Sequence, residues 1–316
     1  MGFLFREAIP LWKKKRRSPG NLRLLNMLER YITDTEAVPI SILTKFWADQ
    51  TAALTYKEIR KMIEDGDVSE EDLENWSKDY SVLVEEKLAP MWAEAIIVGQ
   101  LGNIILDSLR DTDFKFEPTD EGIQRWIEAR GDEFITASVK EQRKAIRRLT
   151  EKAIRDEMSP DELARIIRPC IGLNNQQAVA NLRYYNRIKE QLRKDHPRMS
   201  EEAVIRRARD KALKYAEKQH RYRAKTIAGD QLAEAYNSGA DFAIRQAQEK
   251  GYIGRVKKVW VTARQSNVCK DCEQVEGVSK EMDETFDVGR CGRKSLPPAH
   301  PRCRCVVKYV EVKEER

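Results

Sequence analysis

Apolar residues along most of the chain recur at the spacing of an α-helix. Between about residues 21 and 250 they lie three or four positions apart, or multiples of these, which places them on one face of a helix. One such face consists of Ile135, Val139, Ile146, Leu149 and Ala153. Turn dipeptides are scarce in this part of the chain, so the pattern predicts a body of long helices.

Three stretches define helices more closely. SPDE (159–162) predicts a helix start, because serine can cap, proline fits the first helical position and glutamate can close a capping box. A further apolar stripe consists of Val204, Ala208, Ala212 and Tyr215. A helix over about 222–249 has small residues on one side, which predicts the close approach of another helix rather than a cofactor site. That side consists of Ala228, Leu232, Ala235, Gly239 and Ala243.

The pattern changes at residues 249–254. The segments VKKVWVT (256–262) and CVVKYVEV (305–312) are short and rich in β-branched residues, which predicts two strands. Glycine and proline gather between residues 289 and 301, and Phe286 is expected to anchor a small core. The pattern therefore predicts an α+β or β-only module of about 65 residues behind the helical body.

Composition supports the helical interpretation and adds a charge pattern. Charged residues make up 35% of the 316 residues and aromatic residues 8%, which suits solvated helices better than a compact β-rich enzyme. Residues 1–139 carry 18 Lys and Arg against 26 Asp and Glu, whereas residues 140–226 carry 24 against 12. The basic segment can face phosphate or an acidic protein surface, or it can be a solvated helix face.

The first 20 residues are expected to form a basic arm. KKKRR (13–17) is followed by SPG (18–20), which ends any helix. The arm either contacts nucleic acid or an acidic partner, or it is a solvated tail. No secretory signal is expected, and the most apolar run (88–106) is interrupted by polar residues, which indicates a buried helix and not a membrane span.

Cysteines near the end of the chain have the spacing of a metal site. Cys269 and Cys272 are separated by two residues, so one turn can direct both thiolates at the same ion. His300, Cys303 and Cys305 follow after a gap of 27 residues. Cytosolic thiols stay reduced and a small module buries little apolar surface, which favours a metal over a disulfide or plain core thiols. The predicted cofactor is structural Zn²⁺.

Five groups compete for the four positions of a tetrahedral zinc site. The predicted ligands are Cys269, Cys272, His300 and Cys303. Cys305 is the first substitute for His300, and Cys291 is a sixth candidate. A closed site of four ligands leaves no position for a catalytic water, and the sequence contains no phosphate-binding glycine loop or hydrolase motif. The chain is therefore not expected to be an enzyme.

The C-terminal half carries a set of motifs in a characteristic order. VWVTAR (259–264), VCKDC (268–272) and PPAHPRCRC (297–305) follow the helical segment 223–251. Together these segments resemble the phage head morphogenesis family, the Mu F-like minor head proteins, and the similarity extends upstream to about residue 160. Two departures occur. Gly229-Asp230-Gln231 stands where the family often has Arg-Thr-Glu, and Gln265-Ser266-Asn267 replaces an acidic residue common before the first cysteine.

The resemblance implies a structural role in a virus particle. Such proteins are minor components of the phage head, associated with the portal vertex and needed for head assembly or DNA delivery. The implied partner is the portal protein, with major capsid protein, scaffolding protein and packaged DNA as further candidates and no membrane. The implied location is the virion head, after synthesis in the host cytoplasm.

The expected fold class is α+β, with predominantly long α-helices and a small C-terminal β-containing zinc module. The expected divisions are a basic arm (1–20), a variable helical region (21–150), the helical body of the Mu F-like domain (151–250) and the zinc-binding module (251–316). One alternative function is a zinc-containing DNA-binding protein, because basic residues gather beside the predicted ligands. These basic residues are Arg290, Arg293, Lys294, Arg302 and Arg304. A second alternative is a metal-dependent nuclease or transferase.

Overall fold

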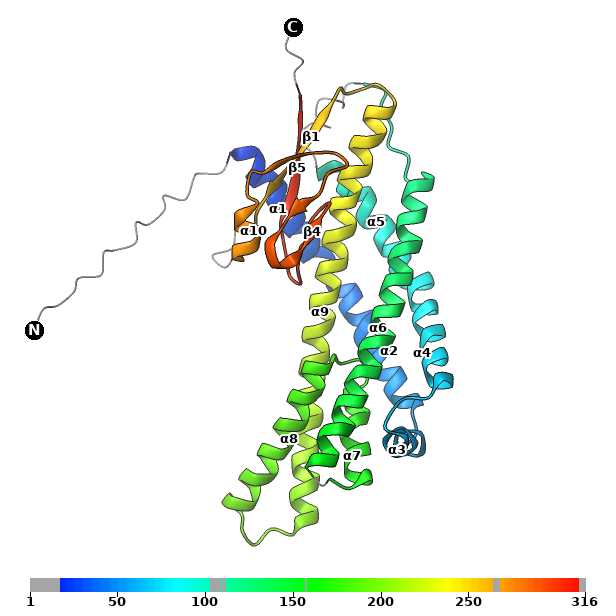
Figure 1. Ribbon diagram of the computed structural model, residues 1–316, viewed down its shortest axis with the longest axis vertical. Coiled ribbons are helices and arrows are strands. Elements are labelled where there is room, and N and C mark those ends of the chain that lie inside the picture. Colours follow the sequence, from blue (N-terminus) through cyan, green and yellow to red (C-terminus); the bar gives the residue numbers. More distant parts are fainter. Residues whose placement is uncertain (1–17, 103–108, 110–111, 157, 264–267, 313–316) are drawn as a thin grey trace, which may run out of the picture.

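The computed structural model describes residues 18–102, 109, 112–156, 158–263 and 268–312. The molecule is elongated, and one long helix runs along most of its length (Figure 1). The predicted basic sequence KKKRR lies outside the described residues. Within them, no helix is both long and apolar enough to cross a membrane.

Helices account for most of the described chain. The long ones are α1 (Pro19–Thr35), α2 (Ala37–Ala53), α4 (Glu70–Leu83), α6 (Glu121–Arg155), α8 (Asn175–Asp195) and α9 (Glu201–Glu249). The shorter ones are α3 (Tyr56–Asp65), α5 (Ala89–Gly99), α7 (Pro160–Ile167) and α10 (Lys270–Gln274). A π-helical turn (Val84–Leu88) joins α4 to α5, and 3₁₀ turns lie at Gln100–Gly102, Arg168–Cys170 and Gly289–Cys291.

The longest helix, α9, is continuous over 49 residues, or about 74 Å at 1.5 Å per residue. The prediction of a separate helix over about 222–249 was too short, because the stripe that begins at Val204 belongs to the same element. Ser200 caps its start by accepting a hydrogen bond from the N–H of Ala203. Gly239 lies where α9 crosses α5, so the small-residue side does meet another helix, as predicted.

The helices enclose two apolar cores that follow one another along the molecule. One core contains α3, α7, α8, the first part of α9 and the second part of α6; these elements occupy the lower end of Figure 1. The other contains α1, α2, α4, α5 and the remaining parts of α6 and α9. Since α6 runs through residue 150, the predicted boundary at that residue lies inside a helix. The division into domains stays a prediction.

The start of α7 is as predicted, with one difference. Ser159 accepts a hydrogen bond from the N–H of Glu162, which caps the helix. The Glu162 carboxylate, expected to close a capping box, instead accepts hydrogen bonds from Tyr185 at 2.5 Å and from Lys189 at 2.6 Å. It thereby ties α7 to α8, because both donors lie on α8.

The loop between α3 and α4 is fixed to α6 by an ion pair. Asp67 accepts two hydrogen bonds from Arg143, at 2.8 and 3.1 Å, and Arg147 lies 3.7 Å away. The Arg143 guanidinium lowers the pKa of Asp67 below its ordinary value of 3.8. The stability that this carboxylate provides is therefore present above pH 3.8 and is lost as the pH falls further.

Replacing Asp67 with asparagine is expected to lower the free energy of unfolding at pH 7. The variant cannot lose a charge, so its disadvantage should be smaller at pH 3 than at pH 7, because the stability from the wild-type carboxylate is lost as the pH falls below 3.8. Urea unfolding followed by circular dichroism at both pH values measures this. An equal difference at pH 7 and pH 3 would show that charge is not the cause.

The strands form a three-stranded antiparallel sheet and a separate two-stranded ribbon. In the sheet, β1 (Val256–Val261) lies between β2 (Ser279–Glu281) and β5 (Val306–Glu311). In the ribbon, β3 (Phe286–Asp287) pairs with β4 (Arg293–Lys294). The two predicted strands correspond to β1 and β5. The predicted α+β class, mostly helical with a small C-terminal β region, is confirmed.

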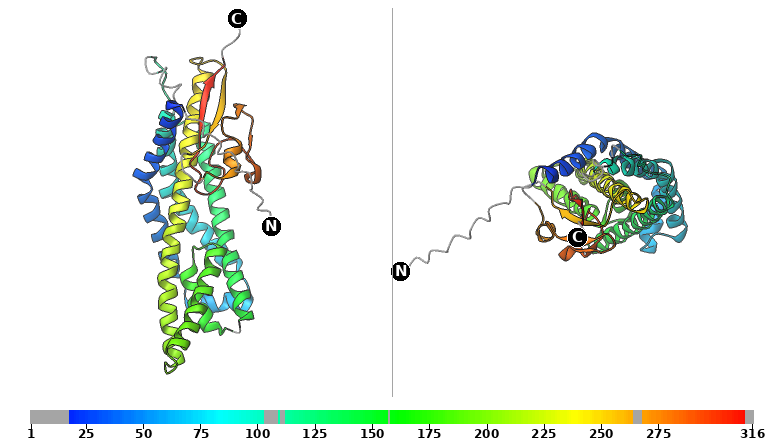
Figure 2. Two further views of the ribbon diagram at one scale, coloured as in Figure 1. Left: turned by 90° about the vertical axis from the view of Figure 1, so that its left-hand side faces the viewer. Right: turned by 90° about the horizontal axis from the view of Figure 1, so that it is seen from above.

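The sheet is built onto α9 and shares its apolar side chains. Val307 and Tyr309 of β5 pack in one cluster with Ala240 and Ile244 of α9. The Tyr309 hydroxyl also donates a hydrogen bond to Asp241 of α9 at 2.8 Å. Figure 2 shows the sheet lying along the upper part of this helix. The position of the C-terminal residues is therefore set partly by the helical body.

Candidate metal centre

The small core beyond the sheet surrounds a cluster of thiols. Trp260 of β1 and Phe286 of β3 are both fully buried, with their ring centroids 5.1 Å apart. Phe286 thus anchors a small core, as predicted. Cys272, Cys303 and Cys305 belong to the same apolar cluster.

The first two candidate ligands lie at the start of α10. Cys269 is the N-cap residue of this helix, and its sulfur accepts a hydrogen bond from the backbone N–H of Cys272 at 3.3 Å. The helical turn therefore places both sulfur atoms on one side, as the two-residue spacing predicted.

The histidine is oriented by its own loop. The Nδ1–H of His300 can donate to the carbonyl oxygen of Pro301, 2.9 Å away. Because a carbonyl only accepts, this hydrogen bond leaves Nε2 with a free lone pair. Nε2 lies 3.1 Å from the sulfur of Cys269 and 3.3 Å from that of Cys272. The Nε2 atom of His300 therefore lies within reach of both thiols.

The remaining two thiols come from the chain just before β5. The sulfur atoms of Cys272 and Cys303 are 4.0 Å apart. The ligand atoms form two groups of three, each with all members within 4.8 Å of one another. One group contains Cys269, Cys272 and His300, and the other contains Cys272, Cys303 and Cys305.

These separations fit a tetrahedral ion. Zinc–sulfur bonds of about 2.3 Å and zinc–nitrogen bonds of about 2.0–2.1 Å hold neighbouring ligand atoms about 3.5–3.8 Å apart. The observed distances of 3.1, 3.3 and 4.0 Å are close to this range. The Cys/His cluster could therefore hold a metal ion.

All four predicted ligand residues lie in this cluster, but not in one group. Cys303 joins the others through Cys272, which belongs to both groups. Cys305 is buried beside Cys303, so the first predicted substitute is also in place. Among the described residues, Cys291 belongs to neither group. Which four residues act as ligands stays a prediction.

Hydrogen bonds among the buried thiols shift their pKa values in opposite directions. Those from Cys272 and Cys305 lower the pKa of Cys303 below its ordinary value. The hydrogen bond that Cys272 donates to Cys303 raises the pKa of Cys272, and burial adds to the increase. A bound divalent cation would stabilise several thiolates at once.

The loop that carries His300 and Cys303 is fixed to α9 by Asp230. The carboxylate of Asp230 accepts a hydrogen bond from the backbone N–H of Arg302 at 2.6 Å, and the Arg304 guanidinium lies 3.4 Å away. Burial raises the pKa of Asp230 to about 6, and these two partners offset only part of the effect. Gly229 leaves room for Arg304, since a Cβ there would lie 2.2 Å from its Nη2.

In the sequence, Asp230 stands out only as a departure from the family pattern. Its partner residues lie more than 70 positions away, and no local spacing could reveal them. Asn237 makes a further long-range contact of this kind. Its side chain donates hydrogen bonds to the carbonyl oxygens of Ala233 and Cys305, at 2.8 and 3.4 Å. Both residues lie on α9, so this helix supports the cluster from outside.

Replacing Asp230 with alanine is expected to lower the free energy of unfolding by about 1.5–3 kcal/mol, the usual range for hydrogen bonds to a charged group. Asp230→Asn keeps an acceptor for Arg302 and should lose less. Urea unfolding measures both. The matched control is Asp210→Ala, since Asp210 lies on α9 with 62% of its side chain exposed. Equal losses in the alanine variants would rule out a specific role of Asp230.

The basic residues beside the cluster are largely engaged within the protein. Arg290 forms an ion pair with Asp271 at 2.9 Å. Arg302 donates a hydrogen bond to the Tyr222 hydroxyl at 3.2 Å, and Arg304 lies against Asp230. These contacts reduce the support for DNA binding through the metal module.

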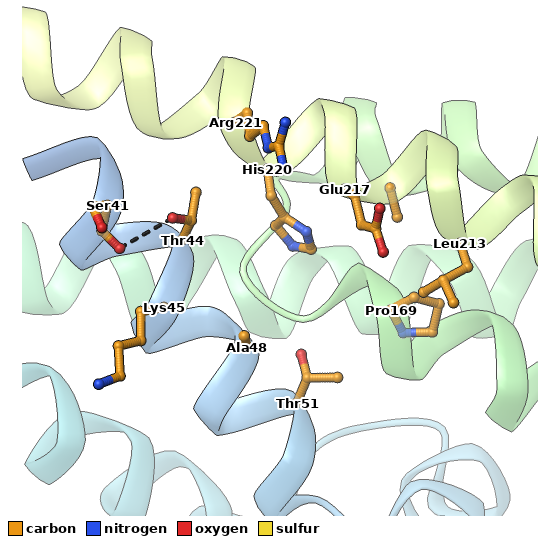
Figure 3. Close-up of a pocket in the computed structure, with 11 residues that line it drawn as sticks. Ser41, Thr44, Lys45, Ala48, Thr51, Pro169, Leu213, Glu217, His220 and Arg221 are labelled. Carbon is orange, nitrogen blue, oxygen red and sulfur yellow. Dashed lines mark hydrogen bonds between the residues drawn. The ribbon is translucent and has the colours of Figure 1, made fainter. Parts of the chain in front are cut away.

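A cavity of 470 Å³ lies apart from the cluster, between α2 and α9 (Figure 3). The ring of His220 contacts the carbonyl oxygen of Ile171 at 2.7 Å, and burial lowers its pKa. The hydroxyls of Thr44 and Thr51 donate to backbone carbonyl oxygens of their own helix. These polar groups are thus already bonded within the protein. The cavity does not show a nucleophile next to a base.

Comparison with known proteins identifies the family. The family model described as Phage Mu protein F like protein matches residues 145–308, more than half of the chain. The match begins in α6 and includes α7, α8, α9 and the whole Cys/His cluster. No curated protein and no solved structure matches the chain. The chain belongs to the Phage Mu protein F like family.

Proposed function

We propose that the chain is a minor head protein of a phage, associated with the portal, whose C-terminal Cys/His cluster is a structural zinc site. Family membership supports a role in phage head morphogenesis and a location in the virion. The family is structural, which agrees with a role other than catalysis. The observation that carries the proposal is the family match, which extends across the cluster and the helix that supports it.

The zinc ligands in this proposal are Cys269, Cys272, His300 and Cys303. Three observations support a structural ion: the distances between ligand atoms, the free Nε2 of His300 and the burial of Cys272 and Cys303. When bound, the ion would join the start of α10 to the loop before β5. Asp230 and Asn237 would then connect this loop to α9, the helix on which both residues lie.

The portal is the proposed partner because the family consists of head proteins and this chain offers long helices for assembly. The test is purification of the tagged full chain from cells that produce the phage, followed by mass spectrometry of the co-purifying proteins. The proposal predicts portal protein, with the chain in fewer copies than the major capsid protein in finished virions. Recovery without any head protein, and absence from purified virions, would overturn it.

A further inference from the structure

A stripe of basic residues runs along the exposed side of α6. Its members recur at intervals of three and four residues, so they share one helix face. This basic stripe consists of Lys140, Arg143, Lys144, Arg147 and Arg148. Lys140, Lys144 and Arg148 follow at steps of four residues, about 6 Å each along the helix axis. The stripe is therefore about 12 Å long.

The stripe borders a groove and is joined there by the start of α8. The groove has a volume of 680 Å³ and is lined by the five basic residues together with Glu151 and Asn175. Asn175 is the first residue of α8, whose N-terminal end carries the positive end of the helix dipole. Figure 1 shows α6 and α8 in the same part of the molecule, and their side chains share one apolar core.

Part of the charge in this groove is not neutralised within the protein. Arg143 is bound by Asp67 and Arg148 by Glu151. Across the part of the chain that the structure describes, neither Lys140 nor Lys144 forms an ion pair, and both are exposed. The lining holds five cations and one carboxylate, and Asp67 outside the lining pairs with Arg143 and Arg147. Lys140 and Lys144 therefore leave positive charge in a concave surface.

We propose that this groove binds the phosphate backbone of duplex nucleic acid. Surfaces that bind nucleic acid are polar and strongly positive, and most of their hydrogen bonds go to phosphate oxygens. Protein-binding surfaces instead place apolar or aromatic residues at their centre and contain few lysines there. The groove has no apolar residue in its lining. Its chemistry therefore favours phosphate over an acidic protein surface.

The proposal places nucleic acid on α6 and not on the metal module. At the module, Arg290, Arg302 and Arg304 already have partners within the chain. The site goes beyond the proposed portal association and does not depend on it. A purified chain can bind duplex DNA whether or not it binds a portal protein, so the two proposals fail independently.

The test compares two full-length variants that lose the same charge. The groove variant replaces Lys140, Lys144, Arg147 and Arg148 with glutamine and keeps Arg143, because Arg143 holds Asp67. The matched control replaces two arginines and two lysines that are exposed on α9, namely Arg206, Arg207, Lys211 and Lys214. Fluorescence anisotropy with a labelled 30-base-pair DNA duplex is measured over a range of salt concentrations. Labelled poly-glutamate serves as the acidic polypeptide probe.

The wild type and the control variant are expected to bind the duplex with similar affinity. The groove variant should bind at least about tenfold more weakly, and its slope of log K against log salt should be smaller by about 3–4, or roughly 0.9 for each lost phosphate contact. If the groove variant does not fold, the double variant Lys140→Gln/Lys144→Gln should reduce the slope by about 2.

Three results would overturn the proposal. The wild type could fail to bind the duplex at low salt. The groove and control variants could weaken binding equally, which would show that only net charge matters. Poly-glutamate could bind the groove as tightly as the duplex does, which would assign the groove to an acidic polypeptide.

Discussion

Replacing Cys272 with serine is expected to empty the metal centre and to cause the largest loss of stability of any single cysteine substitution. Cys272 belongs to both groups of ligand atoms, and it is almost fully buried. Its loss would leave two ligand atoms in each group. Binding of structural zinc contributes on the order of 10 kcal/mol in small zinc-finger peptides.

The loss should be smaller here than in an isolated zinc finger, because β5 also packs against α9. A decrease of about 3–5 kcal/mol in the free energy of unfolding is expected, in the upper range for single substitutions. Metal content is measured by elemental mass spectrometry of the purified chain, and stability by urea unfolding. The helical signal in circular dichroism should persist, since both helical cores lie outside the cluster.

Cys291→Ser is the matched control for this substitution. Cys291 lies near the cluster and is half-buried, but it belongs to neither group of ligand atoms. The variant should keep its metal and nearly all of its stability. Loss of metal from Cys291→Ser, or retention of metal in Cys272→Ser, would contradict the arrangement of the site.

Replacing Gly239 with alanine is expected to destabilise the helical body by about 3 kcal/mol or more. A Cβ at Gly239 would lie 2.1 Å from the carbonyl oxygen of Ile96 on α5. At the same crossing, a Cβ at Gly99 would lie 2.0 Å from the carbonyl oxygen of Tyr236. Backbone atoms cannot turn aside as a flexible side chain can, so the two helices would have to separate.

The sign of this effect distinguishes packing from helix propensity. Alanine normally stabilises a helix interior by about 0.5–1 kcal/mol relative to glycine. Gly254→Ala is the control, because a Cβ there meets nothing within 4 Å and the backbone does not have a positive φ. It should change the free energy of unfolding by less than about 1 kcal/mol. A neutral or stabilising Gly239→Ala would show that α5 and α9 do not cross as closely as described.

The helical and strand content followed from the sequence because it depends on local periodicity. The continuity of α9 did not. Ala216 is buried in one core and Ala224 is buried in the other, so the apolar stripe shifts between them. Because the buried side of α9 changes between the two cores, comparison with one ideal helical period suggests two separate helices.

The Cys/His cluster followed from the cysteine spacing, but the choice of four ligands did not. A two-residue spacing fixes Cys269 and Cys272 on one turn, whereas Cys303 and Cys305 both reach the cluster from the chain before β5. Spacing alone does not decide between them, because the choice depends on the path of that loop. The path is in turn set by distant contacts, such as Asp230 with the N–H of Arg302.

Residues 229–231, which depart from the family pattern, make specific contacts in this chain. Gly229 gives Arg304 space, Asp230 binds the loop backbone, and Gln231 accepts a hydrogen bond from Arg130 of α6 at 3.1 Å. The three residues thus connect α9 both to the loop that carries His300 and Cys303 and to α6. A replacement that restores the commoner residues would have to change all of these contacts together.

X-ray absorption at the zinc edge of the purified full-length chain would show directly whether the Cys/His cluster binds zinc and through which atoms. We expect about one zinc ion per chain, bound by three sulfur atoms at about 2.3 Å and one nitrogen atom at about 2.0–2.1 Å. A spectrum with four sulfur atoms and no nitrogen would exclude His300 as a ligand and bring Cys305 into the site. A purified chain that neither contains zinc nor takes it up would contradict the metal centre itself.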